Sequence, residues 1–336
     1  MRKLVSIVVP IYNEERVLPE LISRMSKTVS ALIGRYDFEI LFVDDGSSDG
    51  SVEVARSLLA QEERLRILEL RRNYGQTAAL QAGIDESHGE YVITMDGDLQ
   101  HFPEEIPSFL AKLEEGYDVV CGWRHDRKEN LLRRWPSQAA NAMIRRLTGL
   151  TIRDVGTTYR AYRMVILKDI RLLGENHRFI PVFAYIAGAR IGEIKIQNIV
   201  RPVGESSYGL TRSLNVFLDI LFVYFYTKYF DRPIRIFGKI SLLLFAVAMI
   251  IAGTLILGSI IMDRPIPGRS GWASMTFFLT AQAIQILLIG ILSEVLARLF
   301  YSSKERMPYH IRNEWNRNSV SSPELARNSD NDTASS

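Results

Sequence analysis

Two long apolar runs in the last third of the chain restrict its fold more than any other feature. The first is Ile240–Met262 and the second is Trp272–Leu292, and neither contains Lys, Arg, Asp or Glu. Each is long enough to cross the hydrocarbon core of a bilayer as a helix, which takes about 20 residues. Inside lipid the backbone must satisfy its own hydrogen bonds, and a single helix does so. The sequence therefore predicts two transmembrane helices within residues 235–301, and the alternative is a pair of buried core helices.

Basic residues are distributed unevenly around these runs. Three stand within residues 232–239 and four within 298–312, whereas the connector 263–271 holds two. The positive-inside rule then places both termini in the cytoplasm and a short hairpin outside. We find no signal peptide, because the apolar stretch Leu4–Pro10 is too short for one. The sequence predicts a multi-pass protein of the inner (plasma) membrane with a cytoplasmic tail at 302–336, disordered after about residue 313.

The single cysteine and the small net charge exclude several classes of protein. Cys121 cannot form an intramolecular disulfide or a cysteine-based zinc site, and its apolar neighbourhood predicts a buried strand end. The formal net charge is +3, and no basic stripe with interleaved aromatic residues occurs. We therefore expect no nucleic-acid partner. Neither a Gly-x-Gly-x-x-Gly after the first predicted strand nor a Gly-Lys-Ser/Thr is present, which excludes dinucleotide dehydrogenases and P-loop proteins.

Short β-rich runs alternate with helical patterns in the first 122 residues. This alternation predicts an α/β domain with a mostly parallel sheet covered on both faces. The predicted strands are Leu4–Pro10, Glu39–Val43, Leu65–Leu70, Tyr91–Met95 and Asp118–Gly122, and the helical patterns are 15–33, 50–62, 76–87 and 103–115.

Three polar clusters follow predicted strands: Tyr12–Glu14, Asp44–Ser47 and Asp96–Asp98. Ligands of such sheets collect at the carboxyl ends of the strands, so we expect the clusters to form one site. Two carboxylates one residue apart can hold Mg²⁺ or Mn²⁺ from one side and leave the other side open to a diphosphate. Asp-x-Asp also occurs in ordinary turns, and Asp44 has the turn role as its alternative. Gln100 is close enough in sequence to reach the same ion.

Two further segments have apolar faces with aromatic residues and basic margins. Residues 131–147 predict a helix lying in the membrane interface, and 211–234 predict a juxtamembrane amphipathic helix. A surface helix packed on its own domain is the alternative for the first. Arg124 lies between the acidic cluster and residues 131–147, and Arg133 and Ser137 lie within that segment. They suit the binding of a phosphate at the lipid surface.

Taken together, these motifs resemble the polyisoprenyl-phosphate glycosyltransferases, a group within family 2 of the glycosyltransferases that has the GT-A (Rossmann-like) fold. The group includes dolichyl-phosphate mannose synthase, undecaprenyl-phosphate glucosyltransferases and the undecaprenyl-phosphate formamido-arabinose transferase. The resemblance covers about residues 1–210, and the two closing spans fit the bacterial members. The matching stretches are Val9–Glu14, Val43–Ser47, Arg72–Gly75, Asp96–Gln100, Asp154 with Tyr159–Arg163, and Arg201 with Gly204–Tyr208.

The resemblance implies a hexosyltransferase and gives roles to individual residues. Asp96, Asp98 and Gln100 would hold Mg²⁺ or Mn²⁺, with Asp98, Asp154 and Arg124 as the catalytic candidates. Donor contacts would come from Pro10, Tyr12, Glu14, Val43, Asp45, Gly97, Arg201 and Ser207, and lipid-phosphate contacts from Arg124, Arg133 and Ser137.

Several points depart from the pattern or stay open. Where relatives carry Lys, this chain has Ser207, so a phosphate-binding cation is missing or supplied elsewhere, with Arg212 as one candidate. Asp154 is either functional or structural, for instance holding Arg160. His101 is read as a helix-entry residue rather than a metal ligand. The Gln-x-x-Arg-Trp motif of processive synthases is absent, because Leu131 stands at the Gln position.

The sequence thus predicts a metal-dependent enzyme, and the resemblance implies that it inverts the configuration at the anomeric carbon. It would transfer one sugar from a nucleotide sugar, first UDP-glucose or another UDP-hexose, to polyprenyl (undecaprenyl) phosphate. UDP-formamido-arabinose or GDP-mannose is the alternative donor. A membrane-bound transferase to a saccharide hydroxyl and an inactive scaffold are the rival readings. The oligomeric state stays open, with a homo-oligomer as one option.

Overall fold

The computed structural model describes residues 2–125, 145, 149–168, 170, 172, 176–197, 225, 229, 233–261, 269–302 and 309–317. The chain forms two compact units. The first comprises Met1–Phe217 together with Met307–Ser336, and the second comprises Leu218–Arg306. All of the predicted interfacial segment 131–147 except residue 145, and nearly all of the juxtamembrane segment 211–234, lie outside the described residues.

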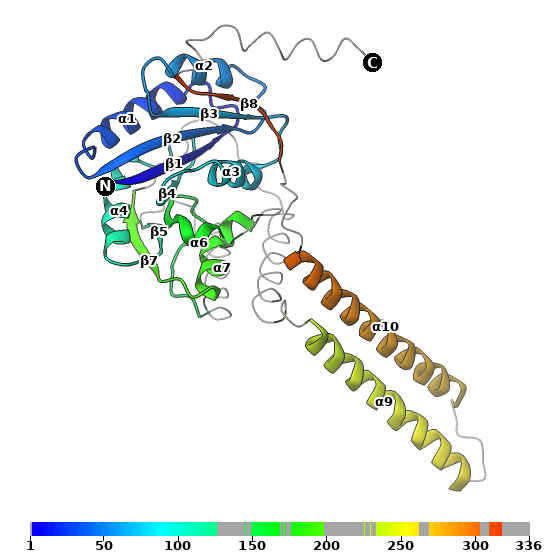
Figure 1. Cartoon of the computed structure of the whole chain (residues 1–336). Coiled ribbons are helices and arrows are strands. Elements are labelled where there is room, and N and C mark those ends of the chain that lie inside the picture. Colours follow the sequence, from blue (N-terminus) through cyan, green and yellow to red (C-terminus); the bar gives the residue numbers. More distant parts are fainter. Residues whose placement is uncertain are drawn as a thin grey trace, which may run out of the picture. The chain divides into compact units, whose positions relative to one another are not determined.

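An eight-stranded mixed sheet organises the first unit, in the order β7-β5-β6-β4-β1-β2-β3-β8 (Figure 1). Strands β1 to β4 pair in parallel, β5 pairs in parallel with β7, and β6 and β8 are antiparallel to their neighbours. The strands are β1 Lys3–Ile11, β2 Tyr36–Asp44, β3 Leu65–Leu70, β4 Tyr91–Thr94, β5 Val119–Arg124, β6 Arg160–Arg163, β7 Ile191–Ile196 and β8 Ile311–Trp315. All five predicted strands are present, and Cys121 is buried in β5 as expected.

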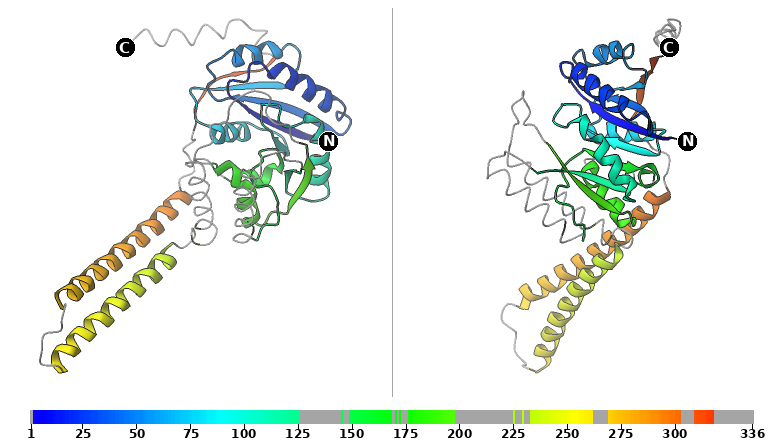
Figure 2. Two further views of the ribbon diagram at one scale, coloured as in Figure 1. Left: turned by 180° about the vertical axis from the view of Figure 1, so that it is seen from behind. Right: turned by 90° about the vertical axis from the view of Figure 1, so that its left-hand side faces the viewer.

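Helices cover both faces of this sheet (Figure 2). On one face, Val5, Ile7 and Val9 of β1 join a buried cluster with apolar residues of α1, α2 and α4. On the other face α3 approaches so closely that a Cβ at Gly83 would lie 2.3 Å from Val8 Cγ1. The helices are α1 Leu18–Ser30, α2 Ser51–Leu58, α3 Gln76–Asp85, α4 Ile106–Glu114, α6 Met164–Leu167 and α7 Ile180–Ile186, with the 3₁₀ turns η1 Pro103–Glu105 and η2 Asn176–Phe179.

In the described part of the second unit, two long helices are present, α9 Ile234–Ile261 and α10 Arg269–Ser302, which coincide with the two apolar runs. They pack against each other through small residues: Ser241 Oγ donates to the carbonyl of Ala283 at 2.7 Å, and Gly290 lies against Phe237. Close packing of small residues is typical of helix pairs in membranes. Both helices are long and apolar enough to span a membrane, and they leave large side chains such as Phe277 exposed.

The chain beyond the second apolar helix differs from the expectation of a disordered tail after about residue 313. Strand β8 continues to Trp315 and pairs with β3, with Ile67 opposite Trp315. Trp315 packs against the core, and the guanidinium of Arg56 lies 4.9 Å from its ring. The polar composition hid this strand because an edge strand is held largely by backbone hydrogen bonds, which composition does not reveal.

Candidate active site

The loops that follow β1, β2, β3 and β4 meet at the carboxyl edge of the sheet. The backbone N–H of Asn13 donates to Ser47 Oγ at 2.9 Å, and Asn13 Oδ1 accepts the N–H of Ser48 at 2.8 Å. The chain register explains the meeting, because Ile11 at the end of β1 lies opposite Asp44 at the end of β2. The prediction that the polar clusters share one edge is therefore confirmed.

The two neighbouring aspartates after β2 have different tasks. Asp44 Oδ2 accepts the N–H groups of Gly46 and Ser47, both at 3.0 Å, which makes it the turn residue. Asp45 instead reaches the next loop, where Oδ1 accepts the N–H of Tyr74 at 2.7 Å and Oδ2 that of Gly75 at 2.8 Å. Burial raises the pKa of Asp45, although the two N–H groups favour its charged form. Asp45 thus fixes the loop after β3 at the site.

Several polar side chains surround the carboxylate of Asp96. Its Oδ1 accepts a hydrogen bond from Gln76 Nε2 at 2.7 Å, and its Oδ2 lies 3.6 Å from His101 Nε2. Burial disfavours its charged form, but the interaction with the His101 ring outweighs burial and lowers the pKa of Asp96. His177, whose Nδ1 lies 2.6 Å from Thr77 Oγ1, also faces this group. Burial, Arg178 and Arg160 lower the pKa of His177 to about 3, so it is neutral at physiological pH.

The backbone around Asp98 is under local strain. Leu99 has a φ of 56°, a left-handed conformation that is costly for a branched side chain. Asn13 has the same φ in the loop after β1, where Asn tolerates it better. The backbone N–H of Gln100 donates to Asp98 Oδ1 at 3.1 Å, which closes the tight loop. Strain of this kind is characteristic of functional sites.

Gly97 brings the two carboxylates against strand β1. A Cβ at this position would lie 2.9 Å from Ile11 Cγ2 and 3.1 Å from the carbonyl oxygen of Pro10. We therefore expect Gly97→Ala to push the acidic loop away from β1, lowering the free energy of unfolding by about 1–3 kcal/mol and weakening nucleotide binding. Thermal unfolding and nucleotide titration measure both. Gly34→Ala is the matched control, because nothing lies within 4 Å of a Cβ there; equal effects of the two variants would contradict the assignment.

Arg124 at the end of β5 forms a two-pronged ion pair with Asp154. Nε lies 2.7 Å from Oδ2 and Nη2 lies 3.0 Å from Oδ1, and both side chains are largely buried. The suggestion that Asp154 holds Arg160 is not supported by the contacts of Arg160. Its guanidinium donates to the carbonyl oxygens of Val155, His177 and Arg178. Arg124 and Asp154 therefore act as one unit on the site edge.

The remaining candidate residues differ in their exposure. Tyr12 is exposed in the loop after β1, whereas Pro10, near the end of β1, and Glu14, in that loop, are half-buried. Val43 is fully buried in β2, with its side chain toward α3, so it offers no surface to a ligand. Arg133, Ser137, Arg201 and Ser207, with Arg212, lie outside the described residues.

Comparison with known proteins identifies the family. Residues 6–171 match the model of glycosyl transferase family 2. A dodecaprenyl-phosphate galacturonate synthase of Rhizobium johnstonii is 41% identical over 314 residues, which are 91% of each chain. The chain belongs to glycosyltransferase family 2. This transferase is 36% identical to an undecaprenyl-phosphate 4-deoxy-4-formamido-L-arabinose transferase of Pseudomonas aeruginosa, over 92% of this chain and 89% of the relative.

Solved structures agree on the fold of the transferase. A glucosyl-3-phosphoglycerate synthase from Mycobacterium tuberculosis, in complex with Mn²⁺, UDP and phosphoglyceric acid, superposes with a TM-score of 0.52. The alignment covers 67% of this chain and 78% of that chain at 16% identity, which shows the fold alone. The predicted GT-A fold and the enzyme class, a glycosyltransferase, are both confirmed.

The sequence gives little or no signal for three residues near Asp96. His101 does precede η1, as expected of a helix-entry residue, and it is also buried beside Asp96. Gln76 follows the Arg72–Gly75 motif directly, so its position was available as a signal. His177 had no such signal, because its sequence neighbours carry no motif and only the fold brings it to Thr77.

Proposed function

We propose that this family 2 transferase moves one sugar from a nucleotide sugar to a polyprenyl phosphate, with inversion at the anomeric carbon. The observation that carries the proposal is the relative named dodecaprenyl-phosphate galacturonate synthase, which aligns over 91% of both chains. An alignment that covers 91% of the chain includes both apolar helices as well as most of the transferase domain. The undecaprenyl-phosphate formamido-arabinose transferases, at 34–36% identity, have the same type of acceptor in their names.

Asp96 and Asp98 are the residues that would hold a divalent ion, with Gln100 beside them. Within the described part of the chain, no group of three or more His, Cys, Asp or Glu side chains is placed to bind a metal alone. This fits Mg²⁺ or Mn²⁺, which is commonly held by one or two carboxylates plus substrate phosphates. The bound ion would neutralise the diphosphate leaving group. The lowered pKa of Asp96 keeps its carboxylate charged for this task.

The Arg124–Asp154 ion pair indicates which kind of acceptor the site can use. A sugar hydroxyl needs a general base, whereas a lipid phosphate is already an anionic nucleophile. Asp154 is a poor base, because both of its oxygens are bound by the guanidinium of Arg124. Arg124 in turn suits a phosphate, with Arg133 and Ser137 of the predicted interfacial segment proposed as further contacts. This favours polyprenyl phosphate over a saccharide hydroxyl as the acceptor.

The protein is proposed to lie in the inner membrane with both termini in the cytoplasm. Two helices long enough to span a bilayer support the membrane location, and the uneven distribution of basic residues supports the orientation. Nucleotide sugar and lipid phosphate would then meet on the cytoplasmic face.

The donor sugar is the finer part of the proposal. A UDP-hexose such as UDP-glucose was the first choice from the sequence, and the named relatives add nucleotide-activated galacturonate and formamido-arabinose. The test presents the purified full chain with undecaprenyl phosphate and labelled UDP-glucose, UDP-galacturonate, UDP-formamido-arabinose or GDP-mannose. We expect chloroform-soluble label from one donor in at least tenfold excess over the others. Label from none of them, with active relatives as the control, would contradict the proposal.

A further inference from the structure

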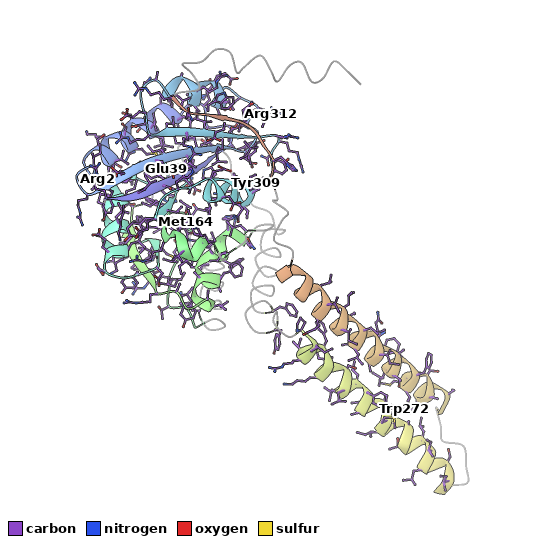
Figure 3. The ribbon with its side chains drawn as sticks, in the orientation of Figure 1. Arg2, Glu39, Met164, Trp272, Tyr309 and Arg312 are labelled. Carbon is purple, nitrogen blue, oxygen red and sulfur yellow. The ribbon has the colours of Figure 1, made fainter. Side chains whose placement is uncertain are left out.

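Strand β8, which follows the second apolar helix in the sequence, contacts the loop that begins at the end of β3. The backbone N–H of Arg71 donates to the carbonyl of His310 at 3.0 Å. Arg312 returns the contact, because its Nη2 donates to the carbonyl of Arg71 at 2.9 Å. Figure 3 shows Arg312 and Tyr309 on this carboxyl-terminal segment beside the sheet. Both polar groups of the Arg71 backbone are thus held, the N–H by His310 just before β8 and the carbonyl by Arg312 within it.

The same arginine also fixes the end of β3. Arg312 Nη1 lies 3.0 Å from Glu69 Oε1, and Asn313 Nδ2 donates to Glu69 Oε2 at 2.8 Å. The Glu69 side chain is mostly buried, so its charge depends on these partners. A second ion pair joins β8 to β3 further along, where Arg66 Nη2 of β3 lies 2.8 Å from Glu314 Oε1 of β8. Strand β8 is therefore anchored by side chains as well as by its backbone pairing.

From Arg71 the loop continues directly to the donor side of the site. The rings of Tyr74 and His310 are 6.4 Å apart at their centroids. The guanidinium of Arg72 lies 4.4 Å from the Tyr74 ring. The N–H groups of Tyr74 and Gly75 hold the two oxygens of Asp45, and Gln76 holds Asp96. A short path of contacts therefore leads from Arg312 to both the proposed nucleoside contact and the proposed metal ligand.

We infer that β8 positions the donor site and that Arg312 is the positioning residue. By holding Glu69 and the Arg71 carbonyl at once, Arg312 fixes the start of residues 71–75, which set the carboxylate of Asp45. The ligand served by this arrangement is a nucleoside diphosphate sugar, and in this respect the inference rests on the proposed function. Residues 303–310 alone separate α10 from β8 in the sequence. The donor site is thus completed by a segment that follows both apolar helices.

Arg312→Ala in the full chain tests this inference. The Arg312 side chain is more than half exposed, and Asn313 continues to donate to Glu69 after its removal, so we expect Arg312→Ala to stay folded. We expect the KM for the nucleotide sugar to rise about fivefold, which corresponds to the free energy of about one net hydrogen bond. The kcat and the KM for lipid phosphate should stay within about twofold of wild type. Arg312→Lys should recover only part of the loss, because an ammonium does not reproduce the two-sided guanidinium contact.

Two further variants and a second measurement separate positioning from general damage. Arg317→Ala is the matched control: it removes an exposed ion pair with Glu63, 3.1 Å long, just after the same strand. His310→Ala removes the ring beside Tyr74 and leaves the backbone carbonyl in place. Hydrogen–deuterium exchange should show faster exchange of the Tyr74 and Gly75 amides in Arg312→Ala and His310→Ala, and unchanged exchange in Arg317→Ala.

The inference is overturned if Arg312→Ala leaves both the donor KM and these amides unchanged. It is equally overturned if Arg317→Ala changes them as much, because β8 would then act through stability alone. Exchange of the amides is measured without any substrate. A wild-type protein that transfers no sugar would therefore refute the proposed function and leave the coupling of β8 to Asp45 to be judged separately.

Discussion

Asp98→Asn is expected to abolish sugar transfer and leave the protein folded. The amide matches the carboxylate in size but lacks the charge that a hard divalent ion requires. Loss of one charge-stabilising group in an active site lowers kcat by a factor of about 10² to 10³. The measurement is the initial rate of label transfer with saturating Mg²⁺ or Mn²⁺ at matched protein concentration, together with circular dichroism.

Asp37→Asn provides the control for this substitution. The Asp37 carboxylate is half-exposed, near the start of β2, and lies 2.9 Å from Arg2. Asp37→Asn therefore makes the same chemical change at the amino-terminal edge of the sheet, and the activity of this variant should equal that of wild type. An Asp98→Asn enzyme that keeps activity within about tenfold of wild type would contradict the assignment of a metal ligand.

The second large effect is expected at the Arg124–Asp154 pair. Asp154→Ala leaves the guanidinium of Arg124 largely buried without its partner, which should lower the free energy of unfolding by about 3 kcal/mol or more. Activity should also fall about a hundredfold, because the guanidinium is then free to leave the position proposed for the acceptor phosphate. Chemical denaturation and the transfer assay measure the two losses.

A double substitution distinguishes the structural loss from the functional one. Replacing a buried ion pair by apolar side chains of similar volume is often neutral for stability. Arg124→Met with Asp154→Leu should therefore recover most of the stability lost in Asp154→Ala, yet remain inactive. If the double variant transferred sugar at the wild-type rate, the pair would be structural only.

The central part of the fold follows from the sequence because each element has a local signal. Strands β1 to β5 are rich in apolar and β-branched residues and are bounded by turn residues, and α1, α2 and α4 between them have apolar faces. The acidic site was predictable for the same reason. Asp44 ends β2, Asp45 follows it, and Asp96 lies just beyond β4, and the carboxyl ends of these parallel strands share one edge of the sheet.

The parts that were not predicted depend on contacts distant in sequence. Strand β6 is short and antiparallel, and β8 takes part in the sheet only because β3 offers it an edge. The partner of Asp154 is likewise 30 residues away, on β5. The burial of Val43 was missed for a different reason. A motif match marks a position as part of a pattern but does not say whether its side chain faces a ligand or the core.

The most direct test of the account compares two acceptors that differ only in their phosphate. Purified full-length protein is given the labelled donor, a divalent metal, and either undecaprenyl phosphate or undecaprenol, with and without a chelator. We expect a labelled lipid from the phosphate alone, and none once the metal is removed. Equal labelling of the alcohol, or labelling that persists in the chelator, would contradict an anionic acceptor and a carboxylate-held metal as the basis of the reaction.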